Sequence, residues 1–130
     1  MSLHAELEQF CGTEQYHRHG LARNVLFTDG VQYLMDKGKC FWLGDAIASY
    51  LPNVAAVRRK YGEDFASFHL WLLRKDGNGA VLTAHVDTGT PAKITQRIEY
   101  TDFPFPEDGV FKLYVIQQDT FFVVMLPSEY

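Results

Sequence analysis

Apolar residues recur at helical spacing in the first half of the chain, and after Gly62 they alternate or cluster in β-rich runs. This change of period predicts an α+β fold, in which about four N-terminal helices pack on an antiparallel sheet of about five strands from the C-terminal half. The chain has 130 residues, the size of one ordinary domain, and we expect residues 1–130 to form a single domain.

Residues that commonly begin and end helices divide the first half into four segments. Thr28 and Asn53 are expected N-caps, because their side-chain oxygens can accept from free backbone N–H groups. Gly12, Gly38 and Gly62 are expected to end helices, because glycine readily adopts the left-handed conformation found there. The four predicted helices cover residues 3–12, 28–38, 41–51 and 53–62.

The predicted strands of the second half are residues 67–74, 80–87, 93–101, 110–117 and 120–126. The last of them is apolar at every position, so we expect it to be covered on both faces or to lie in a subunit interface. The loop 101–106 contains two aromatic residues held by prolines, which is typical of a packed plug or of a binding ridge.

The strongest turn signal is Asp76-Gly77-Asn78-Gly79. A two-residue loop would place Leu70 and Leu72 on the same face as polar residues of the next strand. A three-residue loop at 77–79 would instead gather the apolar residues on one face, and we favour it. It places His69, Trp71, His85 and Asp87 together on the opposite face.

Charge and composition exclude some classes of partner. The net charge is −4, which argues against a nucleic-acid partner and against a polybasic membrane anchor. The longest apolar runs are too short to cross a bilayer, and the N-terminus is typical of an amphipathic helix and not of a signal peptide. We therefore expect a cytoplasmic protein with no membrane partner, in which Cys11 and Cys40 are free thiols.

Four residues have the chemistry of zinc ligands: Cys11, His17, His19 and Cys40. Their spacing matches none of the usual zinc-binding patterns, so we expect no metal here. We also expect no cofactor, because the chain has no phosphate-binding glycine-rich loop.

The segment 16–23 is the densest cluster of cationic side chains. If it folds back toward the second helix, then His19 and Arg23 would converge with the backbone N–H groups near Thr28 to form a cradle for a carboxylate or phosphate. The alternative is a solvated loop whose arginines pair with Glu14 or Asp29.

Two further groups are candidates for a site. His69 or His85 with Asp87 would form an oriented general base on the sheet, or merely a cross-strand contact on an outward face. Asp45 is an isolated carboxylate in the apolar segment 41–51. It lies either on an exposed stripe or in a buried contact with Arg18, Arg23 or Tyr33.

The chain carries several short motifs over nearly its whole length: Gln9-Phe10 with Gly12-Thr13-Glu14, His19-Gly20-Leu21, Phe27-Thr28-Asp29-Gly30-Val31-Gln32-Tyr33-Leu34, Trp42-Leu43 with Asp45-Ala46-Ile47-Ala48, Tyr100-Thr101-Asp102-Phe103-Pro104 and Leu126-Pro127-Ser128-Glu129-Tyr130. With them it resembles a family of short uncharacterised proteins from plasmids, phages, other mobile elements and cyanobacteria. The resemblance implies an accessory protein of a mobile element and selects seven positions to test: His19, Thr28, Asp29, Tyr33, Trp42, Asp45 and Asp102. The closing Leu126–Tyr130 segment is expected to dock in a fixed place.

These observations favour a non-enzymatic binding module, expected to be a homodimer, that engages a protein or a small acidic ligand. The residues expected to make contact are His19, Arg23, Asp29 and Trp42. One alternative is a small hydrolase or lyase that uses His69 or His85 with Asp87 as its base. A second alternative is an acidic mimic of nucleic acid, which is less favoured because the acidic residues are dispersed.

Overall fold

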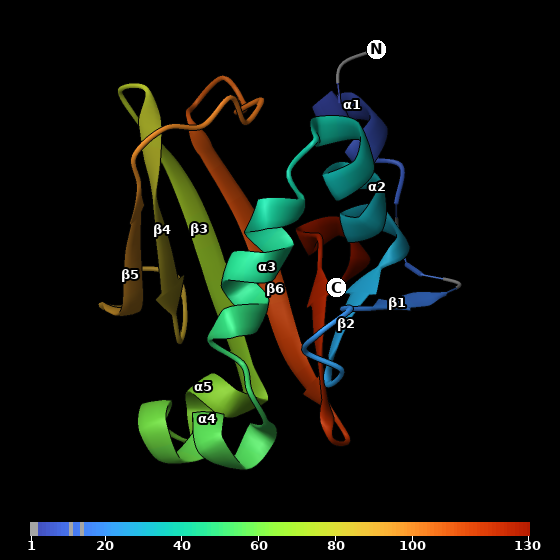
Figure 1. Cartoon of the computed structure of the whole chain (residues 1–130), viewed down its shortest axis with the longest axis vertical. Helices are drawn as coiled ribbons and strands as arrows, with labels where there is room; N and C mark the ends of the chain where they lie inside the picture. The colour runs from blue at the N-terminus through green and yellow to red at the C-terminus, as the bar shows by residue number, and fades with distance from the viewer. Residues whose placement is uncertain (1–2, 11, 14) are drawn as a thin grey trace.

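The computed structural model describes residues 3–10, 12–13 and 15–130, and Figure 1 shows how its elements are arranged. The helices are α1 (Leu3–Leu7), α2 (Asp29–Gly38), α3 (Phe41–Ser49), α4 (Val54–Tyr61), α5 (Glu63–Ser67) and the short 3-10 helix η1 (Pro127–Glu129). The strands are β1 (Tyr16–Arg18), β2 (Val25–Thr28), β3 (Phe68–Asp76), β4 (Gly79–His85), β5 (Ala92–Ile98), β6 (Val110–Gln118) and β7 (Phe121–Met125). The α+β class is confirmed. The described residues contain five α-helices where about four were expected and seven strands where about five were expected.

The sheet is mixed, with the strand order β1-β2-β7-β6-β3-β4-β5. The expectation of an antiparallel sheet was wrong at one position, because β2 runs parallel to β7. The N-terminal hairpin of β1 and β2 adds to the edge of β7, so the chain's second strand lies beside its last one. Strands of three and four residues are too short to give a clear alternating pattern, which is why the sequence did not indicate them.

Helices cover one face of the sheet, and α3 crosses that face in front of the central strands (Figure 1). The side chains beneath the helices form one core that runs from β2 to β5 and includes Phe27, Trp71, Leu82, Leu113 and Val124. The second and fourth helices begin at the predicted caps, since Thr28 accepts from the Val31 N–H and Asn53 accepts from the Ala56 N–H.

The hairpin between β3 and β4 has the two-residue loop that we disfavoured. Asp76 pairs with Gly79, and Trp71 pairs with Ala84. Gly79 is therefore a strand residue and not part of a bulged turn. It faces the backbone of β5 so closely that a Cβ atom would lie 2.1 Å from the Ile98 carbonyl oxygen. The close contact of Gly79 with β5 therefore selects the register of β3 against β4. A turn signal in the local sequence carries no information about a contact with a third strand.

The last strand is covered on both faces within the chain itself. β7 lies between β2 and β6, and Phe122, Val123 and Val124 are fully buried. Of the two explanations offered for its apolar sequence, the structure therefore selects coverage within the chain. The loop 101–106 likewise acts as a plug, because Phe103 is buried against the rings of Phe105 and Phe111.

Candidate ligand-binding cleft

A cleft of about 660 Å³ lies between the loop that follows β1 and the helices α2 and α3. Its lining includes a set of apolar residues: Leu21, Phe27, Met35, Phe41, Gly44 and Ala48. Its polar side chains include His19, Gln32, Asp45 and Ser49. A concave apolar surface with a few polar groups is the usual form of a binding site.

Helix α3 contributes one exposed stripe to this cleft. Phe41, Asp45 and Ser49 are exposed at a spacing of four residues, and the other side of the helix is buried. Gly44 allows α3 to approach α2, because a Cβ atom there would lie 2.6 Å from the Met35 sulfur and 3.1 Å from the Phe27 ring. The spacing of this stripe is visible in the sequence, and it could have identified Phe41 as a surface residue.

His19 and Asp45 meet at the cleft, and the distance from His19 Nε2 to Asp45 Oδ1 is 2.8 Å. The other ring nitrogen of His19, Nδ1, accepts from the backbone N–H groups of Leu21 at 3.1 Å and Ala22 at 2.9 Å. Because Nδ1 acts as an acceptor, the proton lies on Nε2 and is donated to Asp45. Both ring nitrogens are thus engaged, and His19 holds the loop 19–22 in a fixed shape.

In the pair of His19 and Asp45, the Asp45 carboxylate is the group that is exposed to solvent. Its side chain is 69% exposed, whereas that of His19 is 13% exposed. Arg18 also lines the cleft, but its guanidinium carbon lies 5.7 Å from the centre of the Phe121 ring, a cation–π distance. Of the alternatives for Asp45, the structure therefore selects the exposed stripe, with His19 as the partner.

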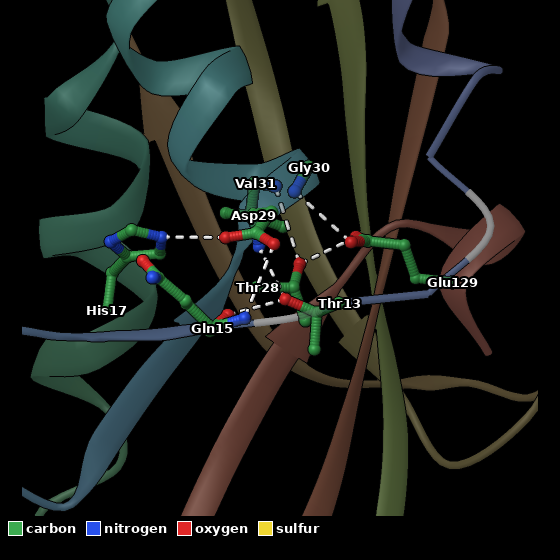
Figure 2. A network of polar contacts seen from close by, with 8 residues as sticks. All are labelled: Thr13, Gln15, His17, Thr28, Asp29, Gly30, Val31 and Glu129. Atoms are coloured by element: carbon green, nitrogen blue, oxygen red, sulfur yellow. Dashed lines mark hydrogen bonds and ion pairs between the residues drawn. The ribbon is translucent and has the colours of Figure 1, made fainter.

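The anion cradle predicted at the second helix is occupied by a carboxylate of the chain itself (Figure 2). Glu129 accepts from the Thr28 hydroxyl at 2.6 Å, from the Gly30 N–H at 3.1 Å and from the Leu126 N–H at 3.0 Å. A negative charge at this point also interacts favourably with the helix dipole. The placement of His19 and Arg23 at this cradle was wrong, because Glu129 takes its donors and His19 binds Asp45 instead.

Asp29 ties the segment 13–17 to the start of α2 (Figure 2). Its carboxylate accepts from His17 Nε2 at 3.0 Å and from the Gln15 N–H at 3.3 Å, and its own N–H donates to the Thr13 hydroxyl. The motif residues 28–30 and Glu129 therefore belong to one network that joins three distant parts of the chain. The expected docking of the segment Leu126–Tyr130 is confirmed by the contacts of Glu129.

Three further candidates lie outside the cleft lining. Tyr33 donates to Glu6 Oε2 at 2.8 Å, and this hydrogen bond is the main cause that raises the pKa of its hydroxyl. Trp42 is partly buried against the core. Asp102 is exposed beside a different, polar pocket near the β3–β4 turn.

Of the residues proposed as a general base on the sheet, His85 and Asp87 line one hollow of about 790 Å³, whereas His69 lies on the other face. His69 is buried under the helices, where it stacks on the Phe65 ring, and burial lowers its pKa to about 4. His85 lies in register with Leu70 on the opposite face, where it donates to the Thr90 carbonyl and accepts from the Thr83 hydroxyl. The Asp87 carboxylate accepts from the Thr88 N–H of its own turn. The two-residue hairpin loop separates His69 from His85, because it changes which residues of β3 and β4 share a face.

The residues considered as zinc ligands have separate partners where the structure describes them. Cys11 lies outside the described residues. His17 and His19 bind separate carboxylates, and the Cys40 thiol donates to the Leu34 carbonyl. Burial raises the pKa of that thiol to about 12, with a smaller contribution from the charge of Asp102. Within residues 3–10, 12–13 and 15–130, no group of three or more His, Cys, Asp or Glu side chains has the arrangement of a metal site.

The fold and cleft define an α+β protein with a mixed seven-stranded sheet and a cleft beside its helices. The chain belongs to a family of unknown function, DUF6876, whose family model matches residues 1–130. No curated protein and no solved structure matches the chain. None of the helices in the described residues is long and apolar enough to cross a membrane.

Proposed function

We propose that this protein is an interaction module and that its cleft receives an apolar segment of a protein that also carries a cationic group. One observation carries the proposal: two exposed apolar side chains flank the cleft, with the Asp45 carboxylate beside them. Leu21 is 92% exposed and Phe41 is 49% exposed. Exposed apolar surface next to a preformed cleft is typical of a protein interaction site.

The state of His19 favours binding over catalysis. A histidine that acts as a general base needs a ring nitrogen with a lone pair directed at the substrate. In His19 the lone pair of Nδ1 accepts two backbone N–H groups, and the proton on Nε2 is held by Asp45. This pair therefore acts as a clamp for the loop, which favours a binding role for the cleft.

The charge at the cleft favours a cationic partner group over the acidic ligand expected from the sequence. Asp45 Oδ1 accepts from His19, and within the described residues no partner occupies its other oxygen. A lysine or arginine of a bound segment would pair with this oxygen, whereas a carboxylate would be repelled. We also propose, from the resemblance that the sequence motifs imply, that the protein is an accessory protein of a mobile element and acts through such contacts.

The test is selection of a random peptide library displayed on phage against the immobilised protein. The expected peptides contain an apolar residue close to a lysine or arginine. Their binding should be lost in Phe41→Ser and retained in Tyr100→Ser, a matched change of an exposed aromatic residue outside the cleft. Asp45→Asn retains the acceptor for His19 and should remove the preference for basic residues. Peptides without this pattern, or binding that Phe41→Ser leaves intact, would refute the proposal.

A further inference from the structure

We infer that a second copy of the chain is a partner for this cleft, with the loop segment Leu21-Ala22-Arg23 of each copy seated at the cleft of the other. The inference rests on the proposed function, since it names the occupant of the same site. It assigns new roles to two residues: Leu21 is the apolar anchor, and Arg23 is the cation that pairs with Asp45 of the second copy.

The segment itself has the chemistry that the cleft accepts. Leu21 projects almost fully into solvent, and Arg23, two residues later, is also exposed. Within the described residues, Arg23 has no ion pair with an acidic side chain of its own chain. An exposed leucine next to a cation with no ion pair among the described residues therefore matches an apolar cleft next to an exposed carboxylate.

The segment is also presented in a fixed conformation. The His19 ring accepts from the N–H groups of Leu21 and Ala22, and the Ala22 carbonyl accepts from the Val25 N–H at 3.0 Å. A loop held in this way loses little conformational entropy when it binds, which favours association.

The position of Leu21 is suited to a symmetric dimer. Leu21 lines the mouth of its own cleft, so the anchor and the receiving surface lie on the same side of the molecule. In an interface with twofold symmetry, each copy uses the same patch as its partner, and a contact from Leu21 to the cleft occurs twice. The two Arg23–Asp45 pairs also offset the repulsion between two chains of net charge −4.

Sedimentation equilibrium of purified variants tests the inference. The wild-type protein should show a monomer–dimer equilibrium that weakens with added salt. Leu21→Ser should weaken dimerisation by about 30-fold, as expected for loss of a central anchor. Arg23→Glu and Asp45→Lys should each weaken it by about tenfold or more through repulsion. Arg59→Glu is the matched control on α4 and should leave dimerisation unchanged, because it lies away from the cleft.

Mixing two variants gives the decisive result. In a heterodimer of Arg23→Glu with Asp45→Lys, both interfacial pairs again join opposite charges, so dimers should reappear in the mixture. Asp45→Asn, which keeps the His19 contact, serves as a second variant and should weaken the dimer without disturbing the loop. A wild-type protein that stays monomeric up to about 1 mM would overturn the inference. So would a mixture that shows no rescue.

The outcomes separate this inference from the proposed function. If the protein is monomeric but still selects apolar and basic peptides through Phe41, the cleft is an interaction site for another protein and only the second-copy inference fails. If it neither dimerises through these residues nor selects such peptides, the proposed function fails as well. If both hold, the selected peptides should compete with dimerisation.

Discussion

The contact between Glu129 and the start of α2 is the most sharply testable stabilising feature of the fold. Substitution Glu129→Ala removes an acceptor from the buried Thr28 hydroxyl and from the Gly30 and Leu126 N–H groups. Hydrogen bonds to a charged group contribute about 1.5–3 kcal/mol each, and the helix dipole adds about 0.3–1 kcal/mol. Because Glu129 is only partly buried, water replaces part of this loss, and we expect a destabilisation of about 2–4 kcal/mol.

Urea unfolding measures this loss directly. With a denaturant slope of about 1.5–2 kcal/mol/M, Glu129→Ala should lower the unfolding midpoint by about 1–2.7 M. Glu129→Gln keeps one acceptor oxygen but not the charge, so its effect should be about half as large. Glu107→Ala, the matched control at an exposed acid, should change the free energy of unfolding by less than about 0.5 kcal/mol. If Glu129→Ala behaved like that control, the docking of the C-terminal segment would not contribute to stability.

Three other predictions follow from buried or crowded positions. Burial lowers the pKa of His69 from 6.5 to about 4, so His69 binds a proton more readily in the unfolded chain than in the folded one. The contribution of neutral His69 to the free energy of unfolding is therefore fully present above pH 6.5 and falls as the pH drops to about 4. Urea titrations should show that the free energy of unfolding falls by about 3 kcal/mol over this pH range. If the same loss persisted in His69→Phe, His69 would not be the group responsible. Gly30→Ala places a Cβ atom 2.6 Å from Leu126 Cδ1, so it should cost about 1–3 kcal/mol in the same assay, whereas Gly20→Ala, with no atom within 4 Å, should be neutral. In a Cys11→Ser background, the Cys40 thiol, whose pKa burial raises to about 12, should react with iodoacetamide only after unfolding; rapid labelling of the native protein at pH 8 would contradict this.

Elements whose signals lie within a few residues were predicted well. The caps Thr28 and Asn53 begin helices α2 and α4, because a cap is a contact between a side chain and an N–H group about three residues later. The strands of the second half appear close to their expected positions, because alternation along a strand is visible in the sequence.

For the site, the sequence indicated some of the residues but not the contacts between them. The sequence indicates both His19 and Asp45 as candidates, but it does not determine that they meet across 26 positions. Leu21 and Phe41 were not singled out, because an apolar residue in a sequence is more often buried than exposed. The cradle at the start of α2 was expected, but its occupant lies about 100 residues away.

By itself, the sequence determined the α+β class, the positions of α2, α3 and α4, and the candidate residues His19 and Asp45. Only the tertiary structure decided the parallel pairing of β2 with β7, the register of β3 against β4 and the cleft beside α3. The physical reason is the range of the interactions. Caps and periodicity depend on neighbours along the chain, whereas pairing, register and clefts depend on which distant surfaces bury one another.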